Sequence, residues 1–275
     1  NKSINSVVDD IYKLLEDGKE VSKEDAEAFG KQLSEIIVQK LGPKNKGSAA
    51  TAASKDGMLR MSNLGSPDRQ LWYRVNRPEL AEPMTGKTLL KFIIGDIYES
   101  VVIFLAEQSG HKVALKQANL EVDGVPGHTD GVLDGRVIDI KSASGYAIRK
   151  FEEHKLETDD PFFYMYQLNG YFDALKDNPE VTDKQNISFL AADKSDGTLV
   201  LDTYKAGGVD TKKEVERKKA VVSSPNIPPR CHEPEKDGSS GNMKLPTPCS
   251  YCAWKKTCWP EARVFLYSSG PRYLT

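Results

Sequence analysis

The sequence predicts a mixed α/β fold in which a central β-sheet is flanked by helices. Segments with helical spacing of apolar residues alternate with short strand-like runs, in the order helix, strands, helix, strands. Two turn signals, Asp134-Gly135 and Asp196-Gly197, each stand between two strand-like runs, as in β-hairpins. This order of elements is typical of a sheet packed against helices.

The composition is that of a folded protein without an overall charge bias. The chain has 275 residues, of which 39% are apolar and 28% charged, enough for one or two domains with a buried core. Its 38 basic and 40 acidic side chains give a formal net charge of −2. A surface that is basic all round is therefore excluded, and a nucleic-acid site must be a local patch.

Four segments follow from the pattern along the chain. Residues 5–16 and 23–41 have helical spacing, which Gly42-Pro43 ends. The small, polar residues that come next have the composition of a flexible linker. We expect a helical segment over 1–43, the linker over 44–57, a core over 58–230 and a cysteine-rich tail over 231–275.

One long helix of the core carries an unusual acidic residue. The helix is expected from Thr88 to Ser109, with Gly110 as its end, and is apolar on nearly every side, which predicts burial. Glu99 lies in its middle, where a carboxylate is costly unless something compensates its charge. The other expected elements are strands over 112–122, 186–192 and 198–204 and helices over 161–176 and 209–222.

The hairpin around Asp134-Gly135 brings charged residues together. The register set by a two-residue loop pairs Asp130 with Asp139, and His128 with Lys141. Directly opposed residues have Cβ atoms about 4.5–5.5 Å apart, and like charges there destabilise a hairpin. Opposed carboxylates make sense when a divalent cation lies between them. Carboxylate oxygens and waters suit Mg²⁺ or Mn²⁺.

These residues carry a resemblance to a known family. Asp130 followed by Asp139-x-Lys141 resembles the catalytic motif of the PD-(D/E)xK nuclease superfamily. Gln167 and Tyr171 are similar to the Q-x-x-x-Y motif of its RecB-like exonuclease branch, and i,i+4 spacing places them on one helix face. The segment 95–99 resembles the family's acidic helical motif, with Tyr98 where many relatives have His.

The resemblance covers residues 58–259 and implies a restriction-endonuclease-like core behind an N-terminal helical extension. It implies a metal-dependent DNA exonuclease in which Lys141 orients or deprotonates the attacking water. Gln167 and Tyr171 would hold Lys141 or the DNA backbone in place. His128 would support Lys141. The implied ligands of Mg²⁺ or Mn²⁺ are Asp130, Asp139, Glu99 and the Ile140 carbonyl.

The four cysteines are confined to the tail. Cys249, Cys252 and Cys258 have a C-x₂-C-x₅-C spacing, and Cys231 lies upstream. Such a set can form disulfides, a zinc site or an iron–sulfur cluster. An intracellular context argues against disulfides, and the x₂ spacing converges thiolates on one ion or cluster. His232 is not expected to be a ligand, because ligands adjacent in sequence are awkward.

The tail resembles that of iron–sulfur nucleases of the same branch, the CRISPR-adaptation nucleases and AddB. Their last three cysteines have a similar spacing and bind a [4Fe–4S] cluster, whereas their first cysteine precedes the catalytic motifs, near a segment similar to residues 65–74. Here Ser66 stands in that region, so Cys231 would complete the set by a different route. A [4Fe–4S] cluster and Zn²⁺ both stay open, and either would pin the tail beside the core.

Two functions remain in view. The first is a stand-alone, metal-dependent DNA exonuclease acting on single strands or ends, such as a phage or CRISPR-adaptation enzyme. The second is a non-catalytic nucleic-acid-binding module stapled by zinc; the intact set of Asp130, Asp139 and Lys141 favours the first.

The expected setting and partners follow. With no apolar run of the ~18 residues that a membrane helix needs, and no signal peptide at the start, we expect a cytoplasmic protein (host cytoplasm if phage-encoded) without a membrane partner. Its partners would be DNA, a second copy of the chain, or recombination and replication proteins.

Overall fold

Residues 2–42, 58–268 and 270–275 are described by the computed structural model, and they divide into two units. The first unit holds residues 2–42, 60–65 and 86–215, and the second holds residues 58–59, 66–85 and most of 216–275. The linker expected over 44–57 lies outside the described residues. None of the described helices combines the length and apolarity that crossing a membrane requires.

A mixed five-stranded sheet forms the centre of the first unit. Its strands are β1 (Val113–Ala114), β4 (Gly131–Leu133), β5 (Arg136–Ala143), β6 (Asn186–Asp193) and β7 (Leu199–Lys205), in that spatial order. Strands β5 and β6 run parallel, and the other neighbours run antiparallel. A separate hairpin consists of β2 (Asn119–Val122) and β3 (Val125–His128). The predicted mixed central sheet is thereby confirmed.

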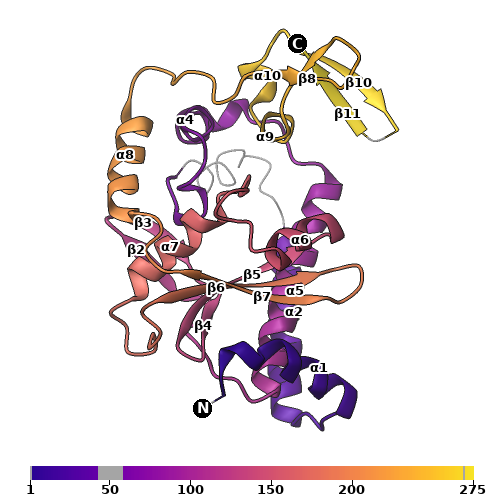
Figure 1. The fold of residues 1–275 in the computed structure, drawn as a ribbon, viewed down its shortest axis with the longest axis vertical. Helices are drawn as coiled ribbons and strands as arrows, with labels where there is room; N and C mark the ends of the chain where they lie inside the picture. Colours follow the sequence, from indigo (N-terminus) through magenta and orange to yellow (C-terminus); the bar gives the residue numbers. More distant parts are fainter. Residues whose placement is uncertain (1, 43–57, 269) are drawn as a thin grey trace. The chain divides into compact units, whose positions relative to one another are not determined.

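Helices cover both faces of this sheet (Figure 1). They are α1 (Val7–Asp17), α2 (Lys23–Leu41), α5 (Gly86–Gln108), α6 (Gly145–Glu152) and α7 (Tyr164–Leu175), with single turns η1 (Ile4–Ser6) and η2 (Met61–Asn63). Alternation along β5 decides what each face receives. Ile138 and Ile140 pack with α1 and α5, so Asp139, between them, faces α6 and α7.

The β4–β5 hairpin has the register that a two-residue loop requires. Leu133 pairs with Arg136, and both loop residues, Asp134 and Gly135, have left-handed φ values of 47° and 88°. The ladder ends at Gly131, one residue short of Asp130.

The expected pairing of His128 with Lys141 is wrong. His128 ends β3, pairs with Asn119 of β2 and is exposed. The turn at Asp123-Gly124 binds β3 to β2, so the chain that carries His128 belongs to a different hairpin and does not continue β4 alongside β5.

The expected burial of the long helix holds only in its second half. Ser100, Val102, Ile103 and Ala106 of α5 are buried, whereas Leu90 and Phe92 are 56% and 50% exposed. A helix of 23 residues is about 35 Å long. Its C-terminal half supplies the residues of the core that it shares with α1 and the sheet, which leaves the first turns with apolar side chains in solvent.

A buried histidine ties α1 to the hairpin loop. His111 lies 2.6 Å through Nδ1 from Asp134 Oδ2 and 3.1 Å through Nε2 from Asp10 Oδ2. The N-terminal residues Ile4, Val7 and Ile11 are buried in the same core as the sheet. The N-terminal helices are therefore part of the first unit.

The second unit combines two segments that are distant in sequence. Its elements are α4 (Asp68–Asn76), η3 (Pro78–Leu80), α9 (Thr247–Ser250), α10 (Lys255–Cys258) and an antiparallel sheet of β10 (Arg263–Tyr267), β11 (Gly270–Leu274), β9 (Met243–Lys244) and β8 (Glu235–Lys236). Helix α8 (Thr211–Ser223) begins in the first unit and ends in the second.

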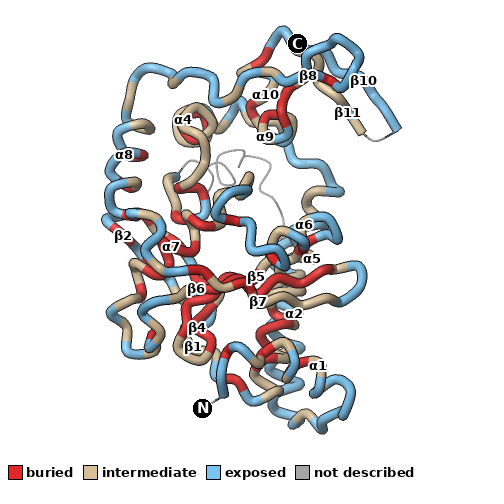
Figure 2. The backbone as a smooth tube through the Cα atoms, viewed as in Figure 1, coloured by how far each residue is buried: buried red, intermediate tan, exposed pale blue. Residues whose placement is uncertain are grey.

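A small aromatic core holds these two segments together. Trp72 and Tyr73 of α4 pack against Trp254, whose indole Nε1 donates a hydrogen bond to the Arg77 carbonyl at 3.0 Å. Figure 2 shows how little of this unit is buried compared with the central strands of the first. The hydrophobic core of the second unit is therefore small.

Candidate functional site

Two carboxylates meet at the open end of the β4–β5 hairpin. Asp139 lies in the middle of β5 and is 1% exposed. Asp130 precedes β4, and its Oδ2 accepts the backbone amide hydrogen of Ile140 at 2.6 Å. This bond replaces the ladder pair that the two-residue loop suggested, and it holds Asp130 beside the strand that carries Asp139.

Lys141 lies at the centre of a chain of polar contacts. Its ammonium forms an ion pair with Asp139 and donates to Gln167 Oε1 at 3.4 Å. Gln167 Nε2 in turn donates to the Tyr171 hydroxyl at 2.5 Å. The structure therefore brings together Asp130, Asp139, Lys141, Gln167 and Tyr171.

Helix α7 positions the last two of these residues, although it begins three residues later than expected. Phe163 adopts a left-handed φ of 61°, which ends the preceding turn and delays the helix to Tyr164. Phe163 is the N-cap residue of α7, and Asp160, three residues before it, accepts the amide hydrogen of Met165 through its Oδ2 at 2.9 Å.

Glu99 approaches the same carboxylates from α5. Burial, then the charges of Asp139 and Asp96, raise the pKa of Glu99 to about 7. The close approach of α5 to β5 depends on Gly95, where a Cβ would lie 3.3 Å from Ser142 Oγ. Glu99 also accepts a hydrogen bond from the Gln117 side chain.

The electrostatics of the group favour a bound cation. Burial, and then the charges of Asp139 and Glu99, raise the pKa of Asp130 well above its usual range. Burial also raises the pKa of Asp139, although Lys141 opposes it. Burial alone would lower the pKa of Lys141, but Asp139 and Asp130 outweigh it, so the ammonium stays charged. One ammonium faces three carboxyl groups whose charges repel one another.

The donor set fits a divalent metal that keeps part of its hydration shell. Apart from the Lys141 ion pair, neither carboxylate oxygen of Asp139 has a hydrogen-bond partner among the described residues. Within the same residues, no three His, Cys, Asp or Glu side chains are placed to hold one metal ion. Mg²⁺ commonly takes one or two carboxylates and completes its shell with water and phosphate oxygens. Asp130 and Asp139 fit that role, with Glu99 acting through water.

The sequence reasoning missed two neighbours of this group. Lys141 Nζ lies 4.7 Å from the centre of the Tyr164 ring, a contact that the position of Tyr164 one helical turn before Gln167 could have suggested. No sequence signal points to Gln117. Tyr98, which stands where many relatives have His, donates to the Lys194 carbonyl at 3.1 Å.

The raised pKa of Glu99 leads to a prediction about stability. A carboxyl whose pKa is about 7 when folded and near 4.3 when unfolded contributes stability below pH 4 that is lost as the pH rises through 7. Without metal, the free energy of unfolding of the Glu99→Gln variant should therefore increase relative to that of the wild type as the pH rises from 5 to 8, by up to about 3 kcal/mol. Denaturant unfolding in EDTA measures this difference.

Saturating Mg²⁺ is the control for this prediction, since a bound cation stabilises the ionised form and should abolish the advantage of the variant. A difference between the two proteins that stays constant from pH 5 to 8 in EDTA would contradict it.

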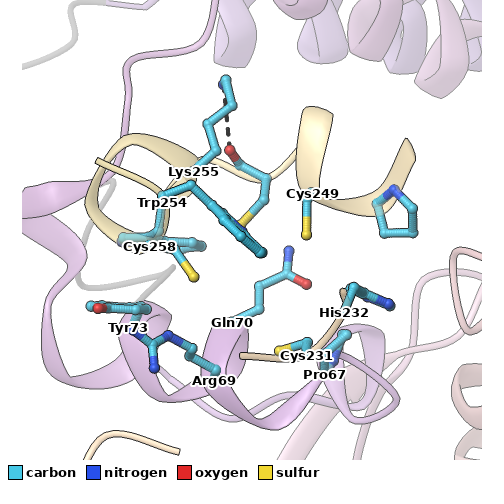
Figure 3. A pocket seen from close by; sticks show the side chains of 13 residues that line it. Pro67, Arg69, Gln70, Tyr73, Cys231, His232, Cys249, Trp254, Lys255 and Cys258 are labelled. Carbon is cyan, nitrogen blue, oxygen red and sulfur yellow. Dashed lines mark hydrogen bonds between the residues drawn. The ribbon is translucent and has the colours of Figure 1, made fainter. Parts of the chain in front are cut away.

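The four cysteines line one cavity in the second unit (Figure 3). Cys249 belongs to α9, Cys252 follows it, Cys258 ends α10, and Cys231 comes from the segment before β8. The cavity encloses about 410 Å³ of empty space, including its part open to solvent. Burial raises the pKa of the Cys249 thiol to about 11 and also raises the pKa values of Cys231 and Cys252.

Cys231 lies at the start of α4. Burial raises the pKa of its thiol, and hydrogen bonds from the backbone amides of Gln70 and Arg69 oppose that rise. Both amides belong to the first turn of α4, where the helix dipole favours negative charge. Cys231 thus approaches the segment 65–74, which contains no cysteine of its own.

The fold and the site define a mixed α/β protein with clustered carboxylates and a lysine at its central hairpin. No protein-family model matches the chain, and no curated protein matches it. Among solved structures, it is similar to an alkaline exonuclease from Laribacter hongkongensis, with 15% identity, a TM-score of 0.34, and coverage of 62% of this chain and 87% of that one. A likeness of this size leaves the function to be argued from the site.

Proposed function

We propose that the first unit is a metal-dependent nuclease with a restriction-endonuclease-like core, a DNA exonuclease of the RecB-like branch of the PD-(D/E)xK superfamily. One observation carries the proposal: Asp130, Asp139 and Lys141 meet at the central hairpin and connect to Gln167 and Tyr171. Two of the motifs from which the resemblance was inferred, the aspartates with Lys141 and the Gln167–Tyr171 pair, come from separate elements and form one contact network.

A purely structural ion pair accounts poorly for this network. An Asp-x-Lys pair on the surface of a strand would be exposed to water. Asp139 is instead almost fully buried, and apart from Lys141 no described residue donates a hydrogen bond to its carboxylate. Burying several carboxyl groups beside a single ammonium costs free energy. Ionisable groups with shifted pKa values in one place are typical of functional sites.

Each residue then has a definite part in phosphodiester hydrolysis. When bound, Mg²⁺ or Mn²⁺ supplies a more acidic water and neutralises charge on the scissile phosphate. Asp130 and Asp139 would hold the ion, with Glu99 acting through water and the Ile140 carbonyl as a further ligand. Lys141 orients the attacking water and stabilises the negative charge that develops on the phosphate.

Gln167 and Tyr171 are positioning residues in this proposal. Gln167 accepts from Lys141 and donates to Tyr171, which fixes the orientation of its amide. Tyr171 is buried, and burial raises the pKa of its hydroxyl, so the phenol stays neutral and holds Gln167 in place.

A time course on 5′- and 3′-labelled oligonucleotides tests the proposal. We expect degradation that requires Mg²⁺ or Mn²⁺ and stops in EDTA, with product ladders that reveal polarity and mode. The absence of hydrolysis with either metal, on both single-stranded and duplex DNA, would refute the proposed enzyme.

We also propose that Cys231, Cys249, Cys252 and Cys258 hold a [4Fe–4S] cluster. All four side chains line a single cavity that is partly open to solvent. Cysteines that surround a space, instead of converging on a point, suit a cluster with one thiolate on each iron.

In this proposal Cys231 takes the place of the upstream cysteine of the related nucleases. It reaches α4 through space, whereas their first cysteine lies in the corresponding segment of the sequence. The cluster would then join the segment 66–85 to the C-terminal tail and reinforce the small core around Trp72 and Trp254.

A further inference from the structure

An exposed aromatic ring stands beside the candidate active site. Phe162 is 59% exposed, and its ring stacks on that of Tyr164 with centroids 5.6 Å apart. The Tyr164 ring lies 4.7 Å from Lys141 Nζ. These two contacts place the Phe162 ring within about 10 Å of the ammonium. A strand with a rise of about 3.4 Å per nucleotide covers that distance with about three nucleotides.

The turn that carries Phe162 is held in place by its neighbours. Pro161 has a restricted φ, and Phe163 adopts a left-handed φ of 61°. Phe163 is turned inward against Gly65, where a Cβ would lie 2.3 Å from the Phe163 Cβ, which no side chain tolerates. Asp160 fixes the other end of the turn, because its Oδ2 accepts the amide hydrogen of Met165 in the first turn of α7. The Phe162 ring is thus presented without the entropic cost of ordering a loop.

Single exposed apolar side chains are common on proteins, so exposure alone means little. Phe162 differs because one face of its ring is occupied by Tyr164, the residue that contacts Lys141, while much of the side chain remains open to solvent. Aromatic rings beside a polynucleotide path stack on unpaired bases with little regard to sequence. Bases inside a duplex already stack on one another and offer no free face.

We propose that Phe162 stacks on an unpaired base of the strand in the active site, which makes single-stranded DNA, free or at a frayed end, the substrate class. The inference rests on the proposed nuclease function. Stacking two or three nucleotides from the scissile phosphate would hold the strand in register over Lys141 while it is cut.

Photo-crosslinking tests the contact without any need for hydrolysis. Oligonucleotides with one 5-iododeoxyuridine at successive positions from the end are bound to the inactive Asp139→Asn variant with Mg²⁺, irradiated and mapped by mass spectrometry. We expect a crosslink to Phe162 from one or two adjacent positions of a single strand, and none from the same positions in a blunt duplex. Crosslinks that map only to other residues would overturn the inference.

Kinetics on the active protein provide the second readout. Phe162→Leu keeps the apolar volume but removes the ring, so KM for single-stranded DNA should rise about tenfold with kcat little changed. Phe162→Tyr should keep the wild-type values. Leu15→Ala, which trims an exposed apolar side chain on α1, should change nothing.

The two proposals fail in different ways. If the wild type hydrolyses single strands but Phe162→Leu has an unchanged KM, the stacking contact is wrong and the nuclease stands. If the wild type hydrolyses nothing with either metal, the nuclease proposal falls, while the crosslinking result still shows whether a single strand lies on Phe162.

Discussion

Replacing Lys141 by methionine should lower the rate of metal-dependent DNA hydrolysis by about 10³-fold or more. Methionine keeps an unbranched apolar side chain of similar length but removes the ammonium that contacts Asp139, Gln167 and the Tyr164 ring. The loss should appear in kcat, because the charge acts on the transition state. Single-turnover hydrolysis of an end-labelled oligonucleotide measures it.

Lys150→Met is a matched control for this variant. Lys150 belongs to α6 of the same unit, is 19% exposed compared with 17% for Lys141, and also pairs with an aspartate, Asp159. Its replacement should leave kcat within about twofold, since surface ion pairs contribute at most about 1 kcal/mol to stability. Equal losses in the two variants, or none in Lys141→Met, would contradict the role of Lys141.

Replacing Cys231 by serine should remove the visible absorbance of the purified protein and most of its iron. The wild type should be brown and contain about four irons per chain, because four thiolates hold one cluster. Without the cluster, the described part of the second unit keeps only two small groups of buried side chains, around Trp72 and around Leu245, so its thermal unfolding should shift to much lower temperature. Absorbance, iron analysis and calorimetry on the full chain measure these effects.

His232→Ala is the companion variant for the cysteine site. His232 also lines the cavity and adjoins Cys231, but it is not one of the proposed ligands, so its loss should leave iron and colour unchanged. Zinc in the purified wild type, or full iron retention by Cys231→Ser, would reject the proposed cluster.

Local signals in the sequence were enough for the hairpin and for the residues on one helix face. Asp134-Gly135 fixed the loop, because a two-residue turn with left-handed backbone selects such residues, and the observed register follows. The spacing of Gln167 and Tyr171 sufficed to place them side by side. Both predictions depend on residues only a few positions apart.

Contacts between distant segments were decided by the tertiary structure alone. His128 does not pair with Lys141, because the turn at Asp123-Gly124 pairs its strand β3 with β2. Asp130 contacts β5 by accepting a hydrogen bond from the backbone amide of Ile140, not as a paired residue of the sheet. Cys231 came to α4 from about 160 residues away in sequence. Periodicity reports which face of an element is apolar, but the packing of one element on another depends on the summed burial of the whole core, which no local pattern contains.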